Sequence, residues 1–126
     1  MIYGIGTDIL SVKRIERLHK KFGAAFAERV LSPEELLEFP QAADPLNYLA
    51  KRFAAKEAFS KAVGTGIRGT VSFANIGIGH DAKGKPEFFY AAALAKWLAD
   101  KGIRHVSLSL SDEEDMVLAF AIAEKA

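Results

Sequence analysis

The sequence has no cysteine and no long apolar run. The lack of cysteine excludes a disulfide framework, a thiolate metal site and a cysteine nucleophile. No apolar stretch approaches the roughly 20 residues that span a bilayer, so we expect no contact with a membrane. The first ten residues also lack the basic flank and the cleavage site of a signal peptide. Together these absences predict a cytoplasmic protein.

The sequence also has no large excess of positive or of negative residues, because its formal net charge is only +1. This balance argues against nucleic acid as a partner, and so does the absence of aromatic residues within the basic stretch 13–21. That stretch carries five Lys or Arg residues against one glutamate, whereas residues 112–115 form a short acidic run. Charge runs are usually solvated surface, and we expect this of the acidic run.

The 126 residues, half of them hydrophobic, suit a single domain over residues 1–126. Their periodicity predicts an α+β fold with strands at the ends and in the middle around one long helix. Ser11 and Ser32 are the expected helix N-caps, and Gly64 is expected to end the long helix. The expected strands are 2–8, 71–78, 86–89, 105–111 and 116–123, and the expected helical segments are 12–21, 24–31, one beginning at 32–35, 46–63 and 91–100.

Glu57 is the unusual residue of the long helix. At 100° per residue it falls within an apolar stripe made of Leu46, Ala50, Phe53 and Ala54. A carboxylate on an apolar face is costly to bury unless it is paired or bound to a metal. Lys61 follows one turn later, which leaves two interpretations open. Either Glu57 and Lys61 form an ordinary ion pair, or Glu57 is a metal ligand or general base and Lys61 contacts a phosphate.

Two further features favour the second interpretation, although each also has an ordinary explanation. Asp8 ends the first expected strand, where it is either a second oxygen ligand for Mg²⁺ or a turn cap. Gly64, Thr65 and Gly66 follow Lys61, and this glycine-rich segment either lets the backbone approach a phosphate or simply ends the helix.

Taken together, these segments resemble the holo-acyl-carrier-protein synthases, the small trimeric branch of the 4'-phosphopantetheinyl transferases. The resemblance runs from residue 1 to about 124. It rests on GIGTDIL at 4–10 with Arg14-Ile15, RFAAKEAFSKAVGTGI at 52–67, GKP at 84–86 and HVSLS at 105–109. It implies the 4'-phosphopantetheinyl transferase fold, in which a small, mostly antiparallel sheet wraps around one long central helix. It also implies a homotrimer with active sites between subunits.

The resemblance implies a reaction in fatty acid biosynthesis: transfer of the 4'-phosphopantetheine group from coenzyme A to a serine of apo-acyl carrier protein. The second product is adenosine 3',5'-bisphosphate. Asp8 and Glu57 would bind Mg²⁺, and Lys61 would contact the pyrophosphate of coenzyme A. Glu57, directly or through a metal-bound water, would take the proton of the serine. The chain needs no nucleophile of its own, because phosphoryl transfer depends on positioning and charge neutralisation.

The resemblance also implies contacts along both substrates. Towards coenzyme A, Arg52 and His105 match positions at the 3'-phosphate. The segment 64–66 would lie along the path of coenzyme A, and Pro86 would lie near its adenine. Towards the carrier protein, the basic helix would dock an acidic helix through Arg14, Lys20 and Lys21. Taken without the resemblance, a histidine that opens a strand, as His105 does, is a capped or solvent-facing residue.

Two other functions remain open at this point. The first is a related transferase that modifies a different carrier, such as a carrier domain within a larger synthase. The second is a non-catalytic protein whose basic helix binds an acidic partner. In that case Glu57 would belong to an ion pair and Asp8 to a turn.

Overall fold

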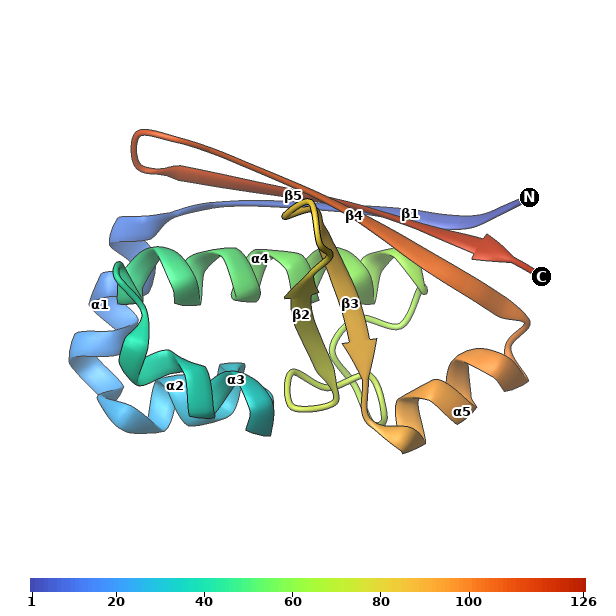
Figure 1. Ribbon diagram of the computed structural model, residues 1–126, viewed down its shortest axis with the longest axis horizontal. Coiled ribbons are helices and arrows are strands. Elements are labelled where there is room, and N and C mark those ends of the chain that lie inside the picture. The colour runs from blue at the N-terminus through green and yellow to red at the C-terminus, as the bar shows by residue number, and fades with distance from the viewer.

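The computed structural model describes residues 1–126, and its strands lie on two sides of one long helix, α4 (Figure 1). The helices and strands agree with the α+β class expected from the sequence. None of the helices has both the length and the apolar character that crossing a membrane requires. In chain order the elements are β1 (Ile2–Ser11), α1 (Val12–Phe22), α2 (Ala24–Val30), α3 (Pro33–Glu38), the 3₁₀ turn η1 (Phe39–Gln41), α4 (Pro45–Ala62), β2 (Ile76–His80), β3 (Pro86–Tyr90), α5 (Ala92–Asp100), β4 (Ile103–Glu113) and β5 (Met116–Lys125).

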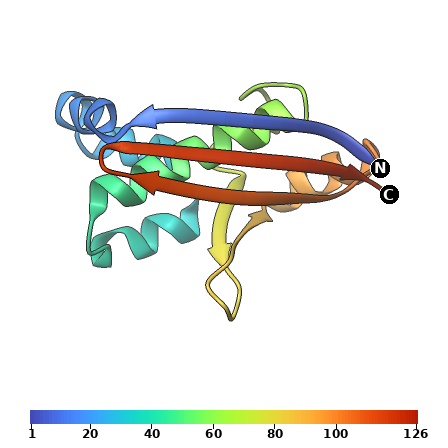
Figure 2. The same cartoon turned by 90° about the horizontal axis from the view of Figure 1, so that it is seen from above.

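The main sheet is antiparallel, with the strand order β1-β5-β4. It forms one layer above α4, and the two chain termini lie together at one end of it (Figure 2). There the backbone N–H of Lys125 donates to the carbonyl of Met1 at 2.8 Å. The β2–β3 hairpin is a separate sheet on another side of α4, where the rings of Phe59 and Phe88 meet with centroids 5.0 Å apart. The long helix is therefore central, as the resemblance implied.

Two glycines determine how closely β1 approaches α4. A Cβ atom on Gly4 would overlap the carbonyl oxygen of Ala62, and one on Gly6 would overlap the carbonyl oxygen of Ala58. Only glycine therefore lets the strand lie directly against the backbone of the helix. Because side chains alternate along a strand, Asp8 is on the same face of β1 as these glycines. The GIGTD segment thus directs a carboxylate towards α4.

The helix ends follow the expected capping residues. The Ser11 hydroxyl accepts from the Lys13 N–H at 3.1 Å, and Ser32 and Glu35 form a capping box at the start of α3. Helix α4 begins with Pro45, just after the N-cap Asp44. It ends before Gly64, which has a φ of 87°. This left-handed conformation favours glycine and stops the helix.

All five expected strands are present, and the bounds of two of them differ most from those observed. Strand β1 continues to Ser11 because it pairs with β5 along its whole length, down to the Ser11–Met116 pair. The strand expected over 71–78 begins only at Ile76. Its first part forms a turn instead, in which the N–H of Asn75 donates to the Ser72 hydroxyl at 3.2 Å. Side-chain hydrogen bonds of this kind compete with strand pairing.

The acidic run 112–115 is only partly the solvated surface that the sequence predicted. Glu113 and Glu114 are exposed. Asp115 is half-buried: its carboxylate accepts from the Ser11 hydroxyl, and its carbonyl accepts from the Val12 N–H at 2.7 Å. The expectation is wrong for Asp115 because the β4–β5 turn folds back onto the start of α1.

Candidate active site

Asp8, Glu57 and Lys61 meet where β1 crosses α4. The Nζ atom of Lys61 donates to the carbonyl oxygen of Thr7 at 2.8 Å and lies 3.4 Å from Oδ1 of Asp8. Glu57 is one turn earlier on α4 and close enough to Asp8 for their charges to interact. No Glu57–Lys61 ion pair forms, so the ordinary interpretation of that spacing is wrong. The lysine instead bridges from the helix to the strand.

Both carboxyl groups titrate above their usual range. Burial raises the pKa of Glu57, and the nearby Asp8 carboxylate raises it further. Burial also raises the pKa of Asp8, although Lys61 and Arg14 partly oppose this. A pair of carboxylates in this state is suited to accept a proton or a cation. The chain has no group of three or more metal-ligating side chains, so a cation here would have two protein carboxylates as ligands.

The most deeply buried charge on α4 belongs to Lys56. Glu57 is only half-buried, whereas the side chain of Lys56 is 0 % exposed and lies 2.6 Å from Oε1 of Glu35. This pair was not expected from the sequence. Two signals were available: Lys56 is three residues from both Phe53 and Phe59 on the helix, and it follows Arg52 at i+4. Charges at such positions need a buried partner.

An apolar cleft of about 370 Å³ adjoins Glu57. It lies among α1, α2, α4 and the segment that precedes β2. Besides Glu57 and Arg29, its lining is apolar and includes Leu18, Phe22, Phe26, Phe53 and Phe73. The sequence did not predict this cleft, because its lining comes from four separate segments. It gives the glutamate an apolar neighbour large enough to accept a substrate group.

The backbone of residues 64–66 does not offer free donors to a phosphate. The N–H groups of Gly64, Thr65 and Gly66 all donate to the carbonyl oxygen of Ser60, at 3.1–3.2 Å. Gly64 and Gly66 both have positive φ, and space for a Cβ is open at each. This segment therefore ends the helix, and a ligand would meet its surface rather than its N–H groups.

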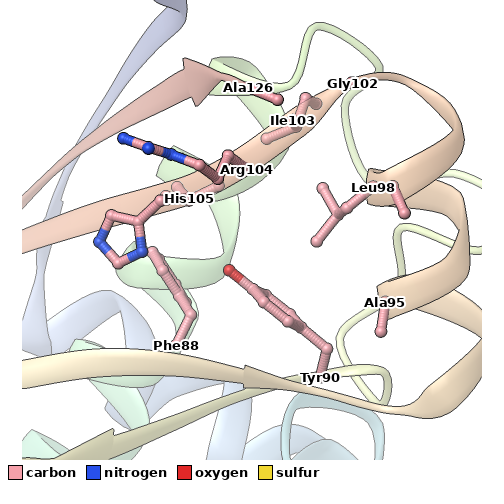
Figure 3. A pocket seen from close by; sticks show the side chains of 11 residues that line it. Phe88, Tyr90, Ala95, Leu98, Gly102, Ile103, Arg104, His105 and Ala126 are labelled. Carbon is pink, nitrogen blue, oxygen red and sulfur yellow. The ribbon is translucent and has the colours of Figure 1, made fainter.

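Arg52 and His105 line different clefts. Arg52 lies in a polar cleft of about 600 Å³ with Lys51 and His80. His105 shares a small cleft of about 80 Å³ with Pro86, and it also borders a larger apolar cleft between β3, β4 and α5. Figure 3 shows this larger cleft, with Arg104 and His105 at its edge. The chain thus brings Pro86 and His105 together, but not Arg52 and His105.

The basic residues of α1 are on the surface. Arg14, Lys20 and Lys21 are all exposed. Arg14 is close enough to act on the charges of Asp8 and Glu57, and its guanidinium carbon lies 5.8 Å from the centre of the Phe53 ring. Lys20 and Lys21 are in the last turn of the helix. Arg14 thus connects the exposed basic surface with the carboxylates.

Comparison with known proteins places the chain in a family. Residues 4–121 match the 4'-phosphopantetheinyl transferase superfamily. The holo-[acyl-carrier-protein] synthase of Neisseria meningitidis serogroup A is 81% identical over 125 residues, which cover 99% of this chain and 100% of that protein.

Solved structures agree with this. A crystal structure of holo-[acyl-carrier-protein] synthase from Neisseria meningitidis superposes with a TM-score of 0.98 at 78% identity, covering 99% of this chain and 100% of that one. A Bacillus anthracis holo-(acyl-carrier-protein) synthase in complex with CoA (3',5'-ADP) matches with a TM-score of 0.83 at 36% identity, over 100% of this chain and 99% of that one. The family resemblance expected from the sequence is confirmed: the chain belongs to the 4'-phosphopantetheinyl transferase superfamily.

Proposed function

We propose that this chain is a holo-acyl-carrier-protein synthase. It transfers the 4'-phosphopantetheine group of coenzyme A to a serine of apo-acyl carrier protein. The observation that carries the proposal is the meeting of Asp8, Glu57 and Lys61 at the crossing of β1 and α4, in a chain 81% identical to a protein of that name. The serine oxygen forms a bond to the β-phosphorus as the bond from that phosphorus to adenosine 3',5'-bisphosphate breaks.

Asp8 and Glu57 fit the requirements of an Mg²⁺ site. Burial raises the pKa of both carboxyl groups, and the charge of Asp8 raises that of Glu57 further; a divalent cation would relieve both effects. Mg²⁺ takes one or two protein carboxylates and completes its coordination with water and substrate phosphate. When bound, it would supply positive charge that stabilises the pyrophosphate during transfer.

The remaining steps belong to side chains of the protein. Glu57, directly or through a water molecule, would take the proton of the attacking serine hydroxyl. Lys61 is half-exposed, so its Nζ can turn from Asp8 towards the incoming pyrophosphate without a change in the backbone. There it would neutralise the negative charge that moves onto the leaving group.

The carrier protein would bind beside α1. Arg14, Lys20 and Lys21 present positive charge to an acidic helix, and such charges mainly favour encounter and orientation. The apolar cleft next to Glu57 would take apolar side chains of the same partner. This arrangement would bring the serine of the carrier to the carboxylates.

We also propose that the active molecule is a homotrimer. The outer face of the main sheet exposes apolar side chains, including Ile5 at 59% and Ile9 at 63%, next to Leu118 and Phe120 of β5. A continuous apolar surface of this kind favours association. A neighbouring copy could also bring a His105 to Arg52, which the single chain keeps in separate clefts. Light scattering should give three times the mass of one chain; a monomeric mass at assay concentration would contradict the proposal.

A cytoplasmic location is the remaining part of the proposal. The chain has no cysteine and therefore no disulfide, and stable disulfides are typical of oxidising compartments. Cell fractionation, with the protein detected by antibody, should recover it in the cytosolic fraction; recovery in the membrane or secreted fraction would contradict this.

The reaction can be tested by intact-mass spectrometry. Purified protein, coenzyme A and Mg²⁺ are incubated with an apo-acyl carrier protein, with and without a chelator. We expect the carrier to gain the mass of one phosphopantetheine, and this gain to disappear with the chelator. If neither carrier proteins nor carrier domains of larger synthases gain this mass, the proposed transferase activity is contradicted. That result would favour a non-catalytic binding protein, whereas a gain that survives the chelator would contradict the metal site alone.

A further inference from the structure

Glu35 is a buried carboxylate for which the proposed mechanism has no use. Its exposed fraction is 1%, and it joins three elements of the fold. Oε1 accepts from the N–H of Ser32 at 2.9 Å and from Nζ of Lys56 at 2.6 Å. Oε2 accepts from the N–H of Ile78 at 2.9 Å and lies 3.2 Å from Nε of Arg52. One carboxylate therefore faces two cations inside the protein.

The two cations differ in how well they are satisfied. Lys56 donates not only to Glu35 but also to the carbonyl oxygens of Val30 at 2.7 Å and Phe73 at 2.9 Å. All three of its N–H groups are therefore used. The side chain of Arg52 makes no hydrogen bond within the chain, and its Nε is buried without an acceptor in hydrogen-bond geometry. The excess positive charge of the cluster thus lies on Arg52.

The guanidinium of Arg52 is nevertheless held firmly. Its side chain is only 9% exposed, and its guanidinium carbon lies 3.5 Å from the centre of the Tyr48 ring. The aromatic ring lies over the guanidinium, and the negative charge of Glu35 attracts the guanidinium from its Nε side. The residue lines the polar cleft that also contains Lys51 and His80. Because its donors are unused, this buried cation can bind a further anion from the cleft in addition to Glu35.

We propose that Glu35 is a positioning residue for Arg52, and that it thereby determines how strongly the protein prefers coenzyme A over the same molecule without its 3'-phosphate. The inference rests on the proposed function, because it takes the anion of the polar cleft to be that phosphate. Glu35 acts on Arg52 through its charge and its position, and it does not contact the substrate. It holds the guanidinium without using the donors that the phosphate needs.

The experiment measures binding of coenzyme A and of 3'-dephospho-coenzyme A by isothermal titration calorimetry. The variants are Glu35→Gln, Arg52→Gln and the double variant, with Glu34→Gln as the control because Glu34 is the exposed neighbour of Glu35. A charge-assisted phosphate contact is worth about tenfold or more in affinity. We expect the wild type and Glu34→Gln to prefer coenzyme A by at least that factor, and Arg52→Gln to lose the preference.

Glu35→Gln should lose most of the same preference, and the double variant should be no worse than Arg52→Gln alone. A purely structural role would lower the melting temperature of Glu35→Gln but leave its preference at the wild-type value, and that result overturns the inference. If Glu35→Gln does not fold because Lys56 has lost its carboxylate partner, the double variant Glu35→Gln/Lys56→Met replaces it in the experiment. This double variant removes the unpaired lysine. If the wild type shows no preference, or Arg52→Gln keeps it, the proposed phosphate contact fails and the inference fails with it.

Discussion

Oδ1 of Asp8 lies 3.4 Å from Nζ of Lys61, so Lys61 pairs with a carboxylate of strand β1 and not with Glu57 on its own helix. No cation lies within ion-pair distance of Glu57. In the chain without a bound cation, burial and the nearby Asp8 raise the pKa of Glu57, which makes its carboxylate a stronger base than an ordinary glutamate. This division of roles leads to the first prediction.

Glu57→Gln should abolish transfer and slightly stabilise the fold. Loss of a general base costs about 100-fold or more in rate. The amide carries no charge to desolvate and no repulsion from Asp8, so the melting temperature should rise by about 2 °C, a small value because the group is partly in water. Rates come from the carrier mass assay and melting from circular dichroism. Normal turnover in this variant would contradict the role of Glu57.

Gly6→Ala should destabilise the protein and remove activity. The new methyl group would overlap the carbonyl oxygen of Ala58, and only a shift of β1 away from α4 relieves this. Overpacking of this kind costs about 1–3 kcal/mol, and the shift would also move Asp8. Urea denaturation measures the effect. Gly79→Ala is the control, because a Cβ there would lie 3.6 Å from Phe89, an ordinary contact. Equal stability of the two variants would show that β1 tolerates the methyl group.

Arg14→Glu should weaken carrier binding and leave coenzyme A binding nearly unchanged. Reversal of the charge places an acid where an acidic helix is expected to dock, so the KM for the carrier should rise about tenfold or more. Lys83→Glu serves as a control, because Lys83 is an exposed cation in the β2–β3 turn, away from α1. An unchanged KM for the carrier in Arg14→Glu would exclude this face of α1 as the docking surface.

The buried Lys56 should make stability depend on pH in the alkaline range. Burial lowers the pKa of Lys56 from 10.5 to about 8. Below pH 8 both the folded and the unfolded chain carry the proton, and the cost of burying the charge is fully present. Between pH 8 and 10.5 the unfolded chain binds more protons, so the free energy of unfolding rises with pH.

Comparison of the wild type with Lys56→Met isolates this effect, because the tyrosines titrate alike in both proteins. From pH 8 to 9 the stability of the wild type relative to the variant should increase by about 1 kcal/mol, as measured by urea denaturation at each pH. A constant difference would mean that Lys56 keeps its proton throughout this range.

The sequence predicted the features that depend on neighbours along the chain. The caps Ser11 and Ser32, the long helix and its end at Gly64 follow from local spacing and from backbone preferences. Helix periodicity singled out Glu57, whereas Asp8 was associated with it as a possible second oxygen ligand at the end of a strand and through the family resemblance. Local patterns therefore gave the fold class, and the resemblance supplied the pairing at the centre of the candidate site.

Features that depend on tertiary contact were missed. Glu35 and Lys56 are 21 positions apart, and only the packing of α3 against α4 brings them together. A turn replaces the first part of an expected strand at Ser72 and Asn75, where hydrogen bonds between side chains and backbone take the place of strand pairing. The family resemblance assigned Arg52 and His105 to the same phosphate, but the fold of the single chain places them in separate clefts, and no local pattern in the sequence indicates this separation.

The order of strands has a consequence for biosynthesis. Strand β1 pairs only with β5, the last strand of the chain, and Asp8 lies opposite Ala119. Until β5 leaves the ribosome, β1 has no partner strand, and Ser11 lacks the Asp115 contact that fixes the start of α1. The first carboxylate of the candidate site therefore reaches its place only after β5 has been synthesised, so a chain truncated before β5 should lack the assembled site.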